Sequence, residues 1–140
     1  MKIKRIVLLM CVVPVLLFSA CNNYGKKPEN TSDRMYELGI LALETIDDYL
    51  DGKIEIEEAD KLLEQIDSSA TSQRESDLKT LDSETLVGTE YANDDLIESY
   101  IYFAQHAVSE RIWISGTKKD IIESRNDLAD RLNEKHIKGE

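Results

Sequence analysis

Cys21 is the residue whose type and surroundings most directly indicate chemistry. It follows an apolar run that ends in two small residues, Ser19 and Ala20. A thiol can be modified covalently or paired in a disulfide, and small residues just before a cleavage point are what a signal peptidase requires. The sequence therefore predicts a processing site at Cys21, which divides the chain into a part that is removed and a part that is kept.

The residues before Cys21 have the pattern of a secretory signal peptide. Residues 1–5 carry three positive charges, and residues 6–18 carry none. A basic start, a short apolar core and a small-residue exit are typical of such signals. The uncharged run of 13 residues is shorter than the roughly 20 that a spanning helix needs, and Pro14 would weaken a helix there. We therefore expect residues 1–20 to be a cleaved signal peptide.

The end of this segment resembles a known processing motif. Phe18-Ser19-Ala20-Cys21 resembles the lipobox of bacterial prolipoproteins, in which small residues precede the modified cysteine. An aliphatic residue is usual where Phe18 stands, so the sequence departs from the pattern there. The resemblance implies a diacylglyceryl group on the Cys21 thiol and cleavage before Cys21. It also implies two or three acyl chains, such as palmitate, whose buried CH₂ groups contribute ~0.8 kcal/mol each to membrane anchoring.

The alternative is an ordinary signal peptide that is cut after Ala20, which would leave Cys21 free or disulfide-bonded. Cys11 and Cys21 are the two cysteines of the chain, and Cys11 would leave with the signal peptide. The mature chain could then form no internal disulfide, and an unmodified thiol outside the cell would be a liability. The cysteine count therefore favours a lipidated Cys21.

A second chemical candidate is the acidic stretch Asp47–Glu58. Its twelve residues overlay the EF-hand calcium loop, with Asp47, Asp51 and Glu58 at positions 1, 5 and 12 and a glycine at position 6. Position 3 is Tyr49, however, where a short oxygen side chain belongs. The alternative is a helical hairpin with a glycine after its first helix and acids at the start of its second helix. This alternative also explains Tyr49, so calcium binding is the less favoured interpretation.

The other candidate chemical groups are weaker. His106 and Glu110 stand four residues apart on a predicted helix, but a metal site would need ligands from elsewhere, and a hydrogen-bonded surface histidine is the favoured interpretation. No serine or cysteine nucleophile has a recognisable partner motif, and the sequence has no glycine-rich phosphate loop. We therefore expect a protein that is not an enzyme and has no cofactor.

Two aromatic residues are candidates for partner binding. Tyr102 and Trp113 lie off the apolar line that contains Tyr100 and Phe103, so we expect them to be partly exposed. Tyrosine and tryptophan are common anchors of protein interfaces. The favoured alternative is that both are ordinary residues at the edge of the core.

The composition after Cys21 is acidic and typical of helices. Residues 21–140 contain 14 basic and 28 acidic side chains, a formal net charge of −14. This charge argues against nucleic-acid binding and against a domain that lies flat on anionic lipid. Glycine and proline are sparse, and no proline follows Pro28. The 120 residues after the signal peptide are therefore expected to form one small, all-α antiparallel bundle of three to five helices.

The apolar spacing predicts the elements of this bundle. Residues 21–33 read as a lipidated tether, of which the twelve residues after Cys21 would reach at most ~40 Å, and residues 34–137 as the helical domain. A first helix is expected from residue 32 or 33 to residue 51, and a second one from about residue 55 to residue 66. A break is expected at residues 68–72, then a possible short helix at 73–82. The last pattern, 93–134, is either one long helix or two helices; we favour a break at Gly116 with an antiparallel return.

The spacing also predicts which side chains form the core. They are Met35, Leu38, Leu41, Ala42, Ile46, Tyr49 and Leu50 in the first helix, Ala59, Leu62, Leu63 and Ile66 in the second, and Leu78 and Leu81 in the possible third. In the last pattern, one face would hold Leu96, Tyr100, Phe103, Ala107 and Ile114, with Ile97, Ile101, Ala104 and Val108 beside it, and Ile121, Leu128 and Leu132 further on.

Two stretches resemble other proteins. Residues 120–129 and 49–54 look like segments of small helical proteins of unknown function from Gram-positive bacteria, a resemblance that supports the all-α class and implies no chemistry. We therefore expect a lipoprotein at the extracytoplasmic face of the cell membrane that contacts an envelope protein. The alternatives are a calcium- or small-ligand-binding module that uses Asp47–Glu58, and a spacer without a specific partner.

Overall fold

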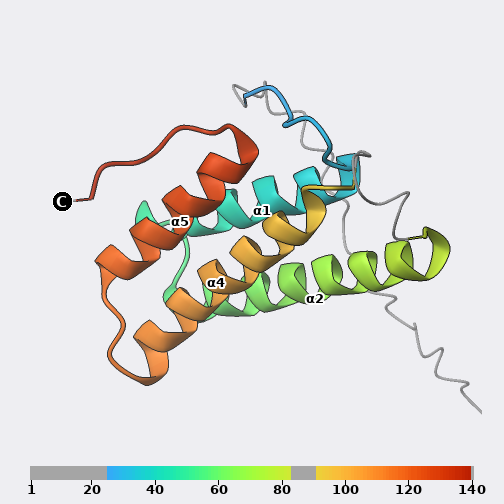
Figure 1. The fold of residues 1–140 in the computed structure, drawn as a ribbon. Helices are drawn as coiled ribbons and strands as arrows, with labels where there is room; N and C mark the ends of the chain where they lie inside the picture. The colour runs from blue at the N-terminus through green and yellow to red at the C-terminus, as the bar shows by residue number, and fades with distance from the viewer. Residues whose placement is uncertain (1–24, 83–90, 140) are drawn as a thin grey trace, which may run out of the picture.

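The structure is a computed structural model that describes residues 25–82 and 91–139. This part of the chain contains four helices and no strand: α1 (Asp33–Leu50), α2 (Ile56–Thr80), α4 (Asp94–Trp113) and α5 (Lys118–Leu132). Figure 1 shows α1 and α2 as one antiparallel pair and α4 and α5 as a second pair packed against it. The expected all-α antiparallel bundle is confirmed.

Helix α1 begins and ends where the sequence predicts. Ser32 is the N-cap, and its hydroxyl accepts a hydrogen bond from the Met35 amide at 3.2 Å. At the other end, Gly52 has φ +73°, the left-handed conformation that stops a helix, and a side chain there would be strained. The chain then turns directly into α2, which makes the expected hairpin.

Helix α2 differs from the prediction. It is one helix of 25 residues that runs through residues 68–72, where a break was expected. The Ser69 hydroxyl donates to the Gln65 carbonyl at 2.8 Å, so this serine satisfies its polar group on the helix itself. Ala70 and Arg74 continue the buried stripe past the predicted break, because they follow Leu63 and Ile66 at helical spacing.

The break between α4 and α5 lies at Gly116, as favoured from the sequence. A Cβ at Gly116 would lie 2.7 Å from the Arg111 amide nitrogen, so the chain turns back tightly against the end of α4. Thr117 then opens α5 with a capping box, in which its hydroxyl accepts from the Asp120 amide at 3.2 Å and the Asp120 carboxylate accepts from the Thr117 amide at 2.7 Å. The hydrogen bonds that the Thr117 amide and the Thr117 hydroxyl donate to the Asp120 carboxylate hold the pKa of this carboxyl below its usual value.

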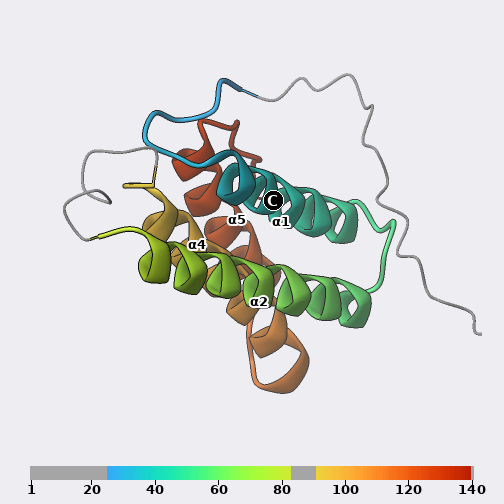
Figure 2. The same ribbon diagram turned by 90° about the vertical axis from the view of Figure 1, so that its right-hand side faces the viewer.

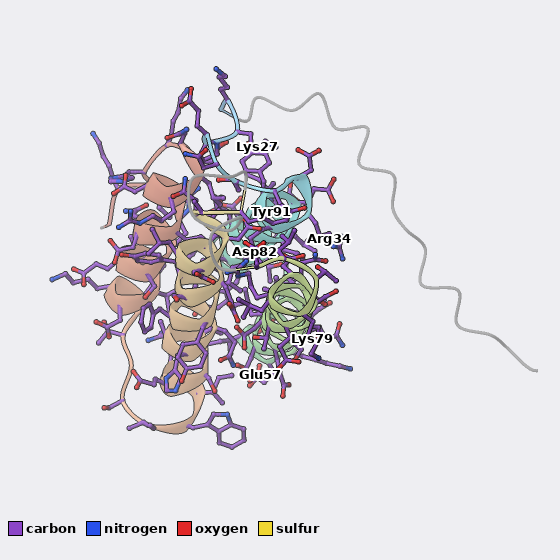
Figure 3. The ribbon with its side chains drawn as sticks, turned by 45° about the vertical axis from the view of Figure 1, so that its right-hand side comes forward. Lys27, Arg34, Glu57, Lys79, Asp82 and Tyr91 are labelled. Carbon is purple, nitrogen blue, oxygen red and sulfur yellow. The ribbon has the colours of Figure 1, made fainter. Side chains whose placement is uncertain are left out.

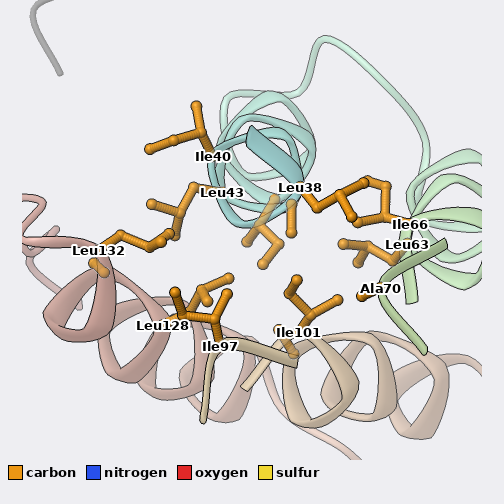
Figure 4. Packing of buried hydrophobic residues seen from close by; sticks show 14 of the residues in the cluster. Leu38, Ile40, Leu43, Leu63, Ile66, Ala70, Ile97, Ile101, Leu128 and Leu132 are labelled. Carbon is orange, nitrogen blue, oxygen red and sulfur yellow. The ribbon is translucent and has the colours of Figure 1, made fainter. Parts of the chain in front are cut away.

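The core lies between all four helices, and Figure 4 shows its side chains converging from α1, α2, α4 and α5. Most predicted core residues are buried, but in α4 the face is shifted. Its buried residues include Ile97, Ile101, Ala104, Ala107 and Val108. Other predicted core residues are exposed, by between 38% and 76%: Leu62, Leu78, Leu96, Phe103 and Ile114. Helix α4 is apolar on two sides, so spacing alone could not show which side faces the core.

The segment before α1 differs from the expected free tether. Residues 25–32 run across the start of α1 and the end of α5, as Figure 2 shows. The Asn93 side chain donates to the Glu29 carbonyl at 2.6 Å, and the Asn93 amide donates to the Asn30 carbonyl at 2.9 Å. The bundle therefore fixes the chain from residue 25 onwards, and the sequence shows no pattern that would have predicted these long-range contacts.

Candidate functional site

Of the predicted site residues, Cys21 lies outside the residues that the structure describes, whereas Tyr102 and Trp113 are both on α4. The Tyr102 side chain is 46% exposed and the Trp113 side chain 77% exposed, so both can be reached by a partner. Across residues 25–82 and 91–139, no helix is both long and apolar enough to cross a bilayer.

Tyr102 and Trp113 share one side of α4. They are eleven positions apart, which is about three helical turns or roughly 16 Å along the axis. His106 and Glu110 lie between them at helical spacing, and the His106 Nδ1 atom is 3.5 Å from a Glu110 carboxylate oxygen. Tyr102, His106, Glu110 and Trp113 are all exposed, and we refer to them as the outer row of α4. The pair that the sequence suggested as metal ligands thus lies in direct contact within this row.

Aromatic contacts hold the first part of the outer row in place. The Tyr102 ring centroid lies 5.8 Å from the Phe103 centroid in an edge-on arrangement and 5.4 Å from that of His106. Phe103 in turn meets Tyr100 edge-on at 6.0 Å, and the Arg131 guanidinium lies over the Tyr100 ring at 5.0 Å. Pairs of this kind order exposed rings, which reduces the entropy that a partner must overcome on binding.

The Asp47–Glu58 stretch has the geometry of the helical hairpin. Both Asp47 carboxylate oxygens accept hydrogen bonds from the Arg125 guanidinium at 2.9 Å, in a two-point ion pair whose arginine side chain is only 7% exposed. Tyr49 stays within α1, and its hydroxyl accepts from Arg111 at 3.2 Å. In the part of the chain that the structure describes, no three His, Cys, Asp or Glu side chains are close enough together to hold a metal ion.

A polar cluster that the sequence did not reveal joins the starts of α1 and α4. Asp94 is fully buried, and its carboxylate accepts from the Ser32 amide at 3.0 Å and from the Ser32 hydroxyl at 2.5 Å. Burial raises the pKa of the Asp94 carboxyl, although the hydrogen bonds from Ser32 and the charge of Arg74 act in the opposite direction. In the sequence, Ser32 and Asp94 stand at the starts of two expected helices, but nothing there indicated that they bond to each other.

Arg74 extends this cluster into α2. Its side chain is 4% exposed and its Nε atom donates to Asp95 at 2.6 Å. The Arg74 Nη1 atom and one Asp77 carboxylate oxygen are buried without a hydrogen-bond partner among the described residues. We assign this cluster a structural role, because its side chains join α2 to the starts of α1 and α4.

Comparison with protein-family models, with curated proteins and with solved structures found no match for this chain.

Proposed function

We propose that the chain is a lipoprotein of the cell membrane, anchored at the extracytoplasmic face, whose small acidic bundle acts by contacting another envelope protein. The observation that carries the anchor is Cys21, which follows an uncharged apolar run and two small residues. The structure of the described residues is compatible with an attached domain, since residue 25 is already held by the bundle and only three residues separate it from Cys21.

The anchor is tested by the intact mass and detergent partitioning of the protein extracted from membranes, beside a Cys21→Ala variant. We expect the wild type to begin at an acylated Cys21 and the variant to lose the added mass and leave the membrane. A wild-type protein that is released without acyl chains would contradict the proposal and would point to a diffusible protein with a free thiol.

The outer row of α4 supports the contact role. Tryptophan and tyrosine are enriched among residues that dominate binding energy, and Trp113 is the most exposed large apolar residue among those described. A photo-crosslinking residue at position 113 should therefore join to one discrete envelope protein in intact cells. A crosslinker at Leu78, which is 58% exposed on α2, is the matched control. Equal products from both positions, or none from either, would contradict a contact through the outer row.

The calcium alternative is tested separately, by calorimetry of the protein with calcium. Because Asp47 is bonded to Arg125 in the structure, calcium could bind there only by breaking a two-point ion pair. We expect no heat at millimolar calcium, either in the wild type or in an Asp51→Ala variant. Heat that the substitution abolishes would favour the alternative.

A further inference from the structure

The segment that leads to the proposed anchor is bound to the bundle by its backbone. The Gly25 amide donates to a Glu134 carboxylate oxygen at 2.6 Å, and the Asn133 side chain donates to the Lys26 carbonyl at 3.2 Å. The Tyr36 hydroxyl donates to the Gly25 carbonyl at 3.2 Å. Two more hydrogen bonds come from Asn93, as described above. The segment is therefore held by α1 and by the residues that flank α4 and α5.

Gly25 makes the closest of these approaches. A Cβ at this position would lie 2.3 Å from the Asn133 carbonyl oxygen, which is a backbone atom at the end of α5 and cannot simply turn aside. Any side chain at residue 25 would therefore push the segment away from α5. A substitution at Gly25 should therefore release residues 25–32 from the bundle without changing how the helices pack.

Docking shortens the connection between the bundle and the bilayer. Gly25 is four positions after Cys21, a length of chain that reaches at most ~14 Å. A free linker up to Asp33 would instead reach at most ~40 Å. A lipid on Cys21 would therefore keep the side of the bundle that carries residues 25–32 next to the bilayer.

The stretches on this side of the molecule are less acidic than the rest of the chain, although Lys27 is bonded to Asp33 and His136 to Asp130 at their edges. The segment 25–32 and the C-terminal tail 131–139 together hold five basic residues and two acidic ones, Glu29 and Glu134, whereas the rest of residues 21–140 holds nine basic and 26 acidic residues. Figure 1 shows segment and tail along the same side, over α1 and α5, and Figure 3 places Lys27 on the side opposite Glu57. The basic residues are Lys26, Lys27, Arg131, Lys135 and Lys138.

We propose that this basic face, residues 25–32 with residues 131–139, rests against the anionic headgroups of the bilayer that holds the Cys21 lipid. The inference rests on the proposed lipid anchor. Lysine and arginine side chains close to a membrane surface are attracted by anionic lipid, and the attraction acts within about a Debye length. The acidity of the whole chain does not prevent this contact, because most acidic residues lie outside this face.

The orientation determines what the protein presents to its surroundings. The turn between α4 and α5 lies on the side away from the basic face (Figure 1). Helix α4 has 20 residues and so spans roughly 30 Å, which separates Trp113 from the docked segment. The bundle could therefore contact the bilayer through the basic face and a partner protein through the Trp113 end of α4 at the same time.

The test uses the acylated full chain in vesicles with single fluorescent labels. A lipidated Cys21 leaves no other thiol in the mature chain, so Lys135→Cys or Ser115→Cys gives one labelling site. Energy transfer to an acceptor lipid should be greater at position 135, whose carbonyl accepts a hydrogen bond from Arg125 in the middle of α5, than at position 115 in the turn between α4 and α5. Equal transfer at the two positions would overturn the proposed orientation.

A substitution at Gly25 and a matched control test whether docking of the segment produces the difference in energy transfer between the two labels. Gly25→Val should abolish the difference between the labels while circular dichroism shows unchanged helix content. Gly139→Val is the matched control, because its Cβ would meet only an ordinary contact at 3.9 Å. A Gly25→Val variant that keeps the full difference would overturn the role of docking.

Changing the lipid composition and the charge of the basic face tests whether anionic headgroups bind this face. The difference should be large with phosphatidylglycerol and small with phosphatidylcholine alone, and Lys26→Glu with Lys138→Glu should reduce it. Lys61→Glu with Lys79→Glu on α2 is the control and should have no effect. The same contrast in both lipids would overturn headgroup binding while leaving the anchor in place, whereas a protein whose mass shows no acyl chains would overturn both proposals.

Discussion

At the scale of single residues, the start of the bundle depends on one hydrogen-bond relay. The Ser32 hydroxyl accepts from the Met35 amide and donates to the buried Asp94 carboxylate. The cap of α1 is therefore positioned by the first residue of α4, a residue 62 positions away in sequence. This relay couples the two halves of the chain through a side chain that has no access to solvent.

We expect Asp94→Ala to destabilise the protein by about 1–3 kcal/mol, because the buried Ser32 amide and hydroxyl would lose their acceptor. Asp94→Asn keeps an acceptor of the same shape and should cost less. The free energy of unfolding in urea measures both. Equal stability of wild type and Asp94→Ala would show that the relay contributes nothing.

The raised pKa of Asp94 gives a prediction with a defined sign. The folded state binds the proton more tightly than the unfolded state does, so stability falls as the pH rises from the ordinary aspartate value of 3.8 through the raised folded-state pKa. Asp94→Asn cannot titrate there. The stability of the wild type relative to Asp94→Asn should therefore decrease across this window, as measured by urea unfolding at a series of pH values. An increase would contradict the burial of this carboxyl.

At the scale of elements, the most informative difference from the sequence prediction is the continuity of α2. Ser69→Pro should cost about 3 kcal/mol or more, because proline would remove a hydrogen bond from the middle of a 25-residue helix and clash with the preceding turn. Ser69→Ala should change the stability by less than about 0.5 kcal/mol. Thermal or urea unfolding distinguishes the two. If both variants were equally stable, the predicted break at residues 68–72 would be correct instead.

The sequence predicted where helices begin and end better than it predicted which side of a helix faces the core. Ser32, Gly52 and Gly116 mark their boundaries by local chemistry, and all three boundaries were predicted. Serine-rich composition around residue 70 wrongly indicated a break, since a serine can bond its hydroxyl to the preceding turn of its own helix.

The face of α4 and the docking of residues 25–32 depend on partners distant in sequence, which local patterns do not contain. The same limit applies to the candidate site. The sequence predicted partial exposure of Tyr102 and Trp113 and favoured ordinary residues at the edge of the core. It also placed His106 and Glu110 four residues apart, but it did not show that all four side chains are exposed on one side of α4.

At the scale of the whole molecule, the tip of α4 is a surface feature rather than part of the core. Trp113→Ala should change the free energy of unfolding by less than about 0.5 kcal/mol, whereas Leu63→Ala at a fully buried position should cost roughly 2–5 kcal/mol. Trp113 is the single tryptophan of the chain, so its fluorescence should be readily quenched by acrylamide in the free protein. Weak quenching would mean that the indole is covered.

The docked segment also imposes an order of events during biogenesis. Gly25 is made early and bonds to Glu134, which is made 109 residues later. Until residues 133 and 134 have been synthesised, Gly25 and Lys26 lack two of their hydrogen-bond partners, and only the contacts from Tyr36 and Asn93 can hold the segment. Full docking of residues 25–32 therefore has to wait for the residues that follow α5, so it is a late step in the folding of this bundle.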